Sequence, residues 1–332
     1  MLKSQIRTSV FVSLLTLTLV LSGCGSSGSS ASTAKKEDIK YPVKPITLLV
    51  WSAAGSPVDI MARQVAKVGE KYLGQPIVVD NKTGGDGAVA MQAMLASPAE
   101  GYTMTANTRS MVTSLATTLK DSLKPDQFTY VYKLQDDPYL LAVRDQSPFK
   151  TLDDLIKQAK EKPGSISISG YGSDSAQALV GADWAKQAAI QTKWVPYDGG
   201  SKAVVAALGG NTDAVLTNLS GVVNQIKAKQ LRILAISTDK RSDLLPDTPT
   251  FKELGYKDLV QSHWRGIMVK VGTPDAVVQK LYNALDKVAS DPDFVSYMKT
   301  GGLITPEKKS YKEFSAEVQA DVKKMEEALK NK

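Results

Sequence analysis

Two side chains that carry out much enzyme chemistry are almost absent from this sequence, which has one cysteine, Cys24, and one histidine, His263. A single cysteine cannot form an intramolecular disulfide, and one cysteine with one histidine is too few for the common zinc sites. The sequence also has no G-x-S-x-G or H-E-x-x-H segment, and His263 lacks a partner arrangement typical of a nucleophilic triad. This inventory predicts a protein that is not an enzyme and holds no metal.

Long apolar runs are also missing after the first thirty residues, and none approaches the roughly 18 residues of a membrane span. A content of 42% hydrophobic and 23% charged residues is ordinary for a globular protein. The formal net charge of +7 is scattered, without an arginine-rich stripe or interleaved aromatic residues. Nucleic acid is therefore not a predicted partner.

The first thirty residues are typical of an export signal. Lys3 and Arg7 precede the apolar run from Val10 to Leu21, which leads into Leu21-Ser22-Gly23-Cys24. A basic start, a short apolar core and small residues before the cleavage point distinguish such a signal from a membrane span. We predict a lipoprotein signal peptide over residues 1–23, a lipid on Cys24 and a flexible tether over residues 24–40. The protein would then be extracytoplasmic and anchored to the cell membrane as a lipoprotein; an uncleaved anchor is the alternative.

Short β-rich runs alternate with amphipathic helical stretches through the rest of the chain, which predicts an α/β fold with mainly parallel sheets flanked by helices. The last helix is expected over Pro306–Leu329, with one apolar stripe. The expected strands are Ile46–Trp51, Pro76–Asp80, Tyr102–Asn107, Tyr139–Arg144, Ser165–Ser169, Thr192–Pro196, Ala214–Thr217, Leu231–Ser237 and Gly266–Lys270.

The passages Thr129–Val143 and Leu259–Ile267 are predicted to cross between two lobes, as in periplasmic binding proteins. One lobe would comprise residues 41–141 plus 264–332, and the other residues 142–263. Two lobes joined by two crossings can close on a ligand by a hinge motion.

Loops rich in Gly, Ser, Thr or Asn follow six of the strands and precede helices. In open α/β sheets the ligand lies beyond the carboxyl ends of the strands, and a helix start offers free N–H groups to an anion. Each loop alone could simply cap a helix. The candidate ligand-binding residues in these loops are Ala53, Ala54, Gly55, Ser56, Thr83, Gly84, Gly85, Asp86, Gly87, Thr108, Arg109, Ser110, Gly172, Ser173, Ser175, Tyr197, Gly199 and Asn218.

One of these loops, from Gly85 to Ala90, matches the G-x-G-x-x-A dinucleotide pattern. The match is short and belongs to the second strand unit, and no acidic residue stands about 20 residues further on. We therefore predict no cofactor.

Taken in order, many short segments resemble the extracytoplasmic solute-binding receptors of the tripartite tricarboxylate transporter family, of the Bug or TctC type. The resemblance covers nearly all of the chain from Tyr41 onward. The segments include Pro45-Ile46-Thr47-Leu48, Ala54-Gly55 with Asp59, Leu73-Gly74-Gln75-Pro76, Gly84 to Gly87, Gly101-Tyr102-Thr103, Lys162-Pro163-Gly164, Val195-Pro196-Tyr197, Leu208-Gly209-Gly210, Leu245-Pro246-Asp247-Thr248-Pro249 and Gly272-Thr273-Pro274.

This resemblance implies a two-lobed receptor that captures a small organic anion and delivers it to the large and small membrane subunits of a secondary transporter. It implies that main-chain groups of Ala53 to Ser56 and Thr83 to Gly87 hold a ligand carboxylate, and that the other loops supply the opposite face. Di- and tricarboxylates and aromatic acids are the implied ligands. A secreted enzyme acting on a small acid and a receptor that feeds a signalling kinase remain alternatives.

Three residues depart from the family pattern: Trp51, Arg109 and Arg265. Arginine binds carboxylates in a planar, bidentate geometry. Our hypothesis is that Arg109, Arg265 or both add positive charge for a ligand with two or more carboxylates. A salt bridge at the surface or between the lobes is the alternative for each.

Overall fold

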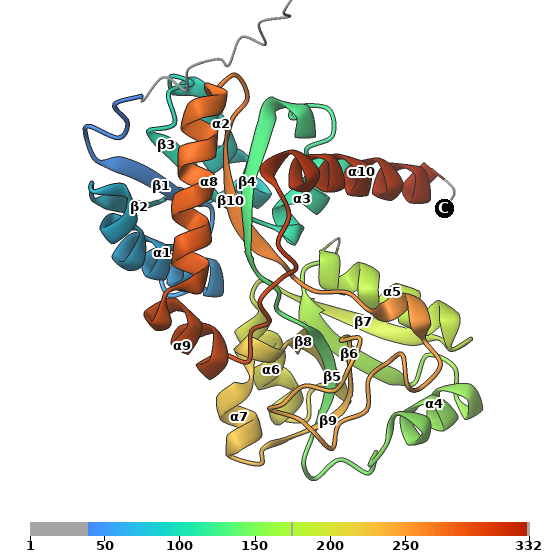
Figure 1. The fold of residues 1–332 in the computed structure, drawn as a ribbon. Coiled ribbons are helices and arrows are strands. Elements are labelled where there is room, and N and C mark those ends of the chain that lie inside the picture. The colour runs from blue at the N-terminus through green and yellow to red at the C-terminus, as the bar shows by residue number, and fades with distance from the viewer. Residues whose placement is uncertain (1–38, 174, 331–332) are drawn as a thin grey trace, which may run out of the picture. The chain divides into compact units, whose positions relative to one another are not determined.

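Two five-stranded sheets, each flanked by helices, organise the protein (Figure 1). The computed structural model describes residues 39–173 and 175–330. The predicted signal peptide, Cys24 and nearly all of the predicted tether lie outside the described residues. The predicted class, a two-lobed α/β fold, is confirmed, and we call the parts built on the two sheets lobe 1 and lobe 2.

Lobe 1 contains the sheet with strand order β2-β1-β3-β10-β4. Its strands are β1 (Ile46–Val50), β2 (Ile77–Asn81), β3 (Thr103–Thr108), β4 (Phe128–Gln135) and β10 (Arg265–Lys270). One apolar core packs this sheet against α1 (Pro57–Leu73), α8 (Asp275–Ser290) and α9 (Pro292–Thr300). A second core packs its other face against α2 (Ala88–Ala96), α3 (Arg109–Ala116) and α10 (Tyr311–Lys330).

Lobe 2 contains the sheet with strand order β7-β6-β8-β5-β9. Its strands are β5 (Tyr139–Arg144), β6 (Ile166–Tyr171), β7 (Thr192–Tyr197), β8 (Ala214–Asn218) and β9 (Leu231–Ile236). One face is covered by α4 (Leu152–Glu161) and α5 (Ala176–Gln187). The other face is covered by α6 (Gly200–Leu208) and α7 (Val223–Lys227).

In each sheet four strands run in one direction and one strand runs against them, so the prediction of mainly parallel sheets is confirmed. The reversed strands are β10 in lobe 1 and β5 in lobe 2, and each is the strand that enters its lobe directly after a crossing. After a crossing the chain enters the new lobe at the edge of its sheet that faces the other lobe. The next strand therefore has to run away from that edge. The remaining strands therefore end at this edge, where ligands bind in open α/β sheets.

The expected strands are all present, and their ends differ from the expected ones by two residues at most. The chain changes sheet between Gln135 and Tyr139, so the lobe boundary expected after Leu141 falls inside β5, which pairs wholly within lobe 2. The signal for this change is the polar segment Gln135-Asp136-Asp137-Pro138, because proline has no N–H group for a strand ladder. The second crossing precedes Arg265, and Ser262 forms a bridge with Pro138 of the first.

The last helix begins at Tyr311, five residues later than expected. Ser310 and Glu313 form a capping box, in which the Glu313 N–H donates to Ser310 Oγ at 3.3 Å and the Ser310 N–H donates to Glu313 Oε2 at 2.8 Å. Phe314, Val318 and Val322 then form the buried side of the helix. Among the described residues, no helix is both long enough and apolar enough to cross a membrane.

Candidate functional site

A serine or threonine hydroxyl caps the first turn of three helices, α1, α3 and α5, at the edge where the strands end. The hydroxyl of Ser56 accepts from the N–H of Asp59 at 3.4 Å at the start of α1. Thr108 caps α3 in the same way, and Ser175 caps α5 with a 3.1 Å bond from Ala178. The Arg109 N–H at the start of α3 donates to the carbonyl oxygen of Trp264 at 3.1 Å. The other N–H groups of these first turns that have no partner within their own helix are available to an anion.

The loop between β1 and α1 is held by a buried carboxylate. Asp59 is 1% exposed and accepts hydrogen bonds from the Gly55 N–H at 2.8 Å, Asn81 Nδ2 at 2.9 Å and Arg63 Nε at 2.9 Å. Burial acts to raise the pKa of Asp59, but the hydrogen bonds from Arg63, Gly55 and Asn81 outweigh it and lower the pKa. The ionised Asp59 therefore fixes the loop that contains Ala53 to Ser56 against the end of β2.

The loop between β2 and α2 has four successive residues with positive φ: Gly84 (123°), Gly85 (55°), Asp86 (53°) and Gly87 (98°). Asp86 is the only member with a side chain, and left-handed backbone is tolerated best by Gly, Asn and Asp. Successive left-handed residues turn their N–H groups toward one side, which makes a concave site suited to an anion. A methyl group on Gly87 would lie 3.0 Å from Met111, so the close packing of this loop on α3 also requires glycine.

A cavity of about 220 Å³ lies between the lobes at this edge. We call it the cleft cavity. Lobe 1 contributes Trp51, the β2–α2 loop and α3, and lobe 2 contributes the β6–α5 loop. Its lining residues are Trp51, Asp86, Ser110, Ser114, Thr117, Thr118, Tyr171, Gly172, Ser173 and Ser175.

The cleft cavity therefore brings together five of the sequence-predicted residues, namely Asp86, Ser110, Gly172, Ser173 and Ser175. The other candidates do not line it: Ala53, Ala54, Gly55, Ser56, Thr83, Gly84, Gly85, Gly87, Thr108, Arg109, Tyr197, Gly199, Asn218 and Arg265.

The sequence reasoning identified Ser110 but missed the other polar residues that follow it on α3 and just beyond its end. Ser110, Ser114, Thr117 and Thr118 follow one another at helical spacing, which places their hydroxyls on one side of the chain as it leaves β3. The i, i+4, i+7 and i+8 pattern was the signal that could have identified them. Thr118 Oγ1 also donates to Asp86 Oδ2 at 3.4 Å, which links this side to the β2–α2 loop.

Within lobe 2 a chain of side-chain amides positions the cleft loops. Gln177, at 7% exposed, accepts from the Tyr171 N–H at 2.9 Å and donates to Asn218 Oδ1 at 2.8 Å. Asn218 Nδ2 in turn donates to the carbonyl oxygen of Asp137 at 3.1 Å. The β6–α5 loop is thus connected through Gln177 to the end of β8 and to the first crossing.

A tryptophan fixes the same loop from outside the cleft cavity. Trp194 Nε1 donates to the carbonyl oxygen of Gly172 at 2.8 Å, and the Gly172 N–H donates to the carbonyl oxygen of Tyr197 at 2.9 Å. The indole lies so close to Gly170 that a Cβ atom there would be 2.1 Å from the ring. Gly170 therefore has to be glycine for Trp194 to reach the loop.

The two arginines singled out in the sequence both contact the crossings between the lobes. Arg109 donates through Nη2 to Gln261 Oε1 at 2.8 Å and through Nη1 to the carbonyl oxygen of Ser262 at 3.3 Å. Arg265 forms a buried ion pair with Asp137 at 2.9 Å. The pair therefore joins β10, the strand that follows the second crossing, to the first crossing, which contains Asp137.

His263 is half-buried near both guanidinium groups, and its Nδ1 is 3.3 Å from the hydroxyl oxygen of Tyr139. Burial, together with the positive charges of Arg265 and Arg109, holds the pKa of His263 well below its usual value.

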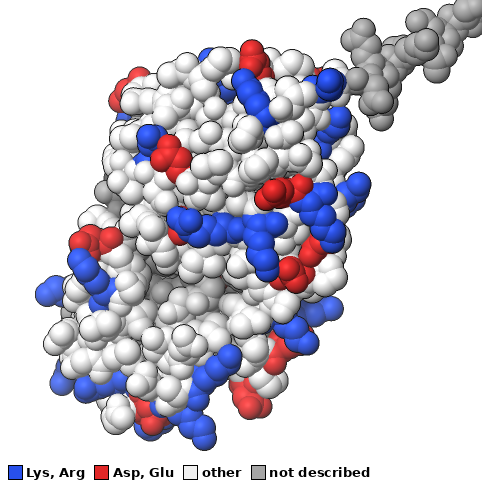
Figure 2. Space-filling model, turned by 90° about the vertical axis from the view of Figure 1, so that its left-hand side faces the viewer, with Lys and Arg blue, Asp and Glu red and all other residues white. Residues whose placement is uncertain are grey.

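Charges of both signs are interspersed on the face shown in Figure 2. Two ion pairs, Lys67–Asp293 and Lys71–Asp291, connect α1 to α9. The described residues contain no cluster of three His, Cys, Asp or Glu side chains arranged to hold a metal ion.

Comparison with known proteins shows which family shares this arrangement. The sequence profile described as "Tripartite tricarboxylate transporter family receptor" matches residues 61–331. Protein BugT of Bordetella pertussis is 30% identical over 274 residues, which cover 80% of this chain and 84% of BugT.

Two solved structures are similar over most of their length. A periplasmic transporter structure has 31% identity and a TM-score of 0.78, and the match covers 87% of this chain and 97% of that one. MatC from Rhodopseudomonas palustris, solved with bound malate, has 25% identity and a TM-score of 0.76, with 86% and 99% covered.

Proposed function

Because the chain belongs to the tripartite tricarboxylate transporter family of receptors, we propose that it captures a small organic carboxylate between its lobes and delivers it to the two membrane subunits of a secondary transporter. The observation that carries this proposal is the cleft cavity, where the β2–α2 loop and α3 of lobe 1 face the β6–α5 loop of lobe 2. The protein releases its ligand unchanged, as a receptor does.

The chemistry of these loops suits a carboxylate. The Gly87 N–H donates to the Gly84 carbonyl oxygen at 3.2 Å, and the rest of the left-handed run from Gly84 and the first turns of α3 and α5 offer N–H groups with the positive ends of helix dipoles behind them. Seven lining residues carry hydroxyl groups, namely Ser110, Ser114, Thr117, Thr118, Tyr171, Ser173 and Ser175. The hydroxyls of Ser114, Thr117, Thr118 and Ser175 already donate to protein oxygens and can accept from bridging waters, whereas those of Ser110, Tyr171 and Ser173 can donate to ligand oxygens. The ligand touches both lobes, so it stabilises their closed arrangement.

We further propose that a second carboxylate of the ligand is attracted by Arg109 and Arg265. Two of their buried nitrogen atoms, Arg109 Nε and Arg265 Nη1, have no hydrogen-bond partner among the described residues. Neither arginine lines the cleft cavity, so a water that bridges from the ligand to one of these buried guanidinium N–H groups would satisfy it and transmit the attraction. The bound malate of MatC, a dicarboxylate, supports the same ligand class for this chain.

The protein is proposed to act outside the cytoplasm, anchored through a lipid on Cys24. The basic start, apolar run and small residues before Cys24 support this location, and the flexible tether over residues 24–40 would let the lobes reach the transporter.

A thermal-shift and calorimetric screen with L-malate, succinate, citrate, phthalate and single amino acids tests the proposal. A ligand that binds only the folded state adds about 2.7 kcal/mol of stability at a hundredfold excess over Kd. Ser173→Trp fills the cleft cavity from its exposed rim and should abolish the response, whereas Ser290→Trp, on the exposed end of α8, should retain it. Equal responses from both variants would place the ligand elsewhere, and conversion of a bound acid would show an enzyme.

A further inference from the structure

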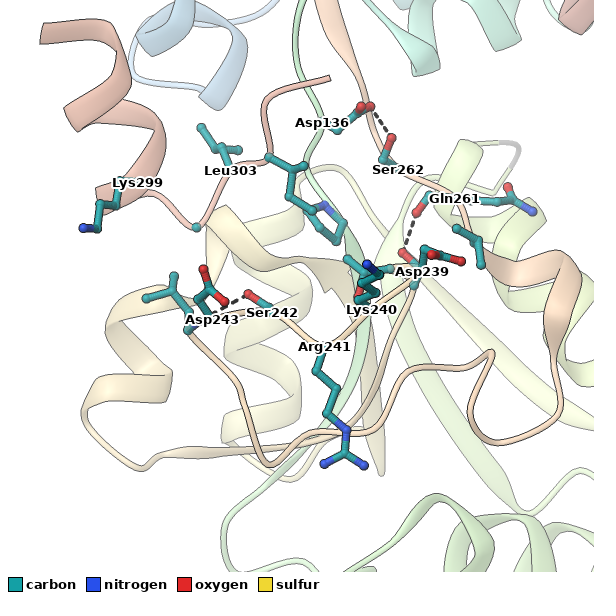
Figure 3. Close-up of a pocket in the computed structure, with 17 residues that line it drawn as sticks. Asp136, Asp239, Lys240, Arg241, Ser242, Asp243, Gln261, Ser262, Lys299 and Leu303 are labelled. Atoms are coloured by element: carbon teal, nitrogen blue, oxygen red, sulfur yellow. Dashed lines mark hydrogen bonds between the residues drawn. The ribbon is translucent and has the colours of Figure 1, made fainter. Parts of the chain in front are cut away.

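A second and larger cavity, of about 640 Å³, lies beside the two crossings (Figure 3). We call it the hinge groove. Asp136 and Pro138 of the first crossing and Gln261 and Ser262 of the second line it. The segment 237–244 after β9 borders it from lobe 2, and the end of α9 with residues 302–304 borders it from lobe 1.

The hinge groove and the cleft cavity lie on opposite sides of the crossing strands. In lobe 2, β5 stands between β8 and β9; the cleft cavity is lined by the loop after β6, whereas the hinge groove is lined by the segment after β9. The two cavities share no lining residue. A ligand of the hinge groove therefore need not be the ligand of the cleft.

Exposed apolar side chains form part of the lining of the hinge groove, beside its polar and charged residues. Leu244, Val260 and Ile304 are 41%, 42% and 41% exposed and come from three separate segments of the chain. Leu303 and Pro138 extend this apolar surface. Large apolar side chains that gather in a concave, exposed place mark binding sites, and the volume lies within the range of small-molecule sites.

Charges at the rim indicate the sign of the ligand. Asp136 pairs with Lys133, Asp239 with Lys252, and Arg241 with Glu253, so these three lining charges are neutralised. Figure 3 shows Arg241 extended away from the other labelled side chains. Lys240, Lys299 and Asp243 form no ion pair within the described residues, which leaves one positive charge in excess.

We propose that the hinge groove is a second binding site, for an amphipathic organic anion with an aromatic or short alkyl body and one acidic group. The apolar body lies against Leu244, Val260 and Ile304, and the acidic group lies at the rim, where Lys240 from lobe 2 and Lys299 from lobe 1 supply the excess positive charge. The bound anion thus contacts both lobes beside their hinge.

Fluorescence titration of the purified protein with 8-anilinonaphthalene-1-sulfonate, itself an amphipathic anion, tests the proposal. Saturable binding at one site is expected. Lys240→Glu/Lys299→Glu should weaken it about tenfold, and Asp243→Asn should strengthen it about twofold, because these changes alter the excess charge in opposite directions. Lys157→Glu/Lys323→Glu, two exposed lysines elsewhere, is the matched charge control and should bind as wild type does.

The apolar contribution is tested by Leu244→Ser against Val271→Ser, since Val271 is 48% exposed outside the groove. Only Leu244→Ser should weaken binding, and the urea midpoint of each variant shows that it is folded. Absence of saturable binding, or equal binding by the wild type and all groove variants, overturns the proposal. Displacement of the dye by octanoate but not by dodecyltrimethylammonium supports the anionic class, and the reverse result contradicts it.

Discussion

Arg265 and Asp137 form an ion pair of 2.9 Å in which the two side chains are 4% and 0% exposed. Asp137 also accepts a hydrogen bond from the Ser220 N–H at 3.1 Å and another from the Ser220 hydroxyl. Arg265 begins β10 in lobe 1, Asp137 lies in the first crossing, and Ser220 follows β8 in lobe 2. One carboxylate therefore connects both lobes at the point about which they would move.

Removal of this carboxylate should be strongly destabilising. Asp137→Ala leaves the buried guanidinium without a counter-charge, and we expect the free energy of unfolding to fall by about 3–5 kcal/mol. Urea unfolding followed by circular dichroism measures the loss. Asp137→Ala/Arg265→Met removes both charges and should recover part of it.

The matched control is Lys67→Met, which breaks the exposed pair between Lys67 and Asp293, whose side chains are 66% and 61% exposed. Exposed pairs contribute little, so the urea midpoint of this variant should stay near that of wild type. An Asp137→Ala variant as stable as Lys67→Met would show that the buried pair does not hold the crossings together.

Asp291 should make stability depend on acid pH. It accepts hydrogen bonds from the Tyr72 hydroxyl at 2.7 Å, Lys71 Nζ at 3.0 Å and the Asp293 N–H at 3.0 Å, and these lower its pKa from 3.8 to about 2. Because the folded pKa is the lower one, the stabilisation is complete above pH 4–5 and is lost as the pH falls toward 2.

The stability difference between wild type and Asp291→Asn should therefore shrink between pH 5 and pH 2, as measured by urea unfolding at several pH values. Tyr72→Phe removes one of the three hydrogen bonds to Asp291 and should show a smaller change of the same sign. A difference that stays constant over this range would mean that Asp291 titrates alike in the folded and unfolded chain.

Gly170→Ala should disturb the cleft from a distance. The new methyl group would lie 2.1 Å from the Trp194 ring, and overpacking of this kind typically costs about 1–3 kcal/mol. Because Trp194 holds the carbonyl of Gly172, the β6–α5 loop should shift and the affinity for the carboxylate found in the screen should fall.

Gly221→Ala is the control for this prediction, since the nearest atom to its new methyl group is 3.8 Å away. Urea unfolding and calorimetric titration of both variants provide the comparison. Unchanged stability and affinity in Gly170→Ala would mean that the ring moves freely and does not position the loop.

Cys24→Ser should release the protein from the membrane. The thiol of Cys24 is the proposed site of lipid attachment, so the serine variant should lose labelling by radioactive palmitate and leave the membrane pellet for the soluble fraction. Ser22→Ala, one of the small residues before the cleavage point, should keep both properties. A wild-type protein that takes up no label would contradict lipidation.

Much of the fold could be predicted because its signals are local. The strand Tyr139–Arg144 was located to the residue, since an apolar β-rich run between polar segments is recognisable in sequence. The start of α10 was misplaced although Ser310 and Glu313 carry the capping-box pattern. The first lobe boundary was misplaced although the polar segment Gln135-Asp136-Asp137-Pro138 between β4 and β5 marks it in the sequence.

The candidate site was only partly predictable, because its members come from separate segments. The loop residues Asp86, Ser110 and Ser173 were identified from helix-start composition, and the structure brings them to one cavity. Gln177 carries no local signal of a role in the cleft, since its partners are the Tyr171 N–H and the Asn218 side chain. The charge of Arg265 is evident in the sequence, but its partner Asp137 lies 128 residues away and could not be identified from the sequence.

By itself the sequence determined the alternation of strands and helices and the polar, glycine-rich character of the six loops, because periodicity and helix capping act over a few residues. Only the tertiary structure decided which loops face one another, which charges are paired and where the hinge groove lies. Those properties depend on contacts between segments far apart in the chain, and burial determines whether such a contact is strong or negligible.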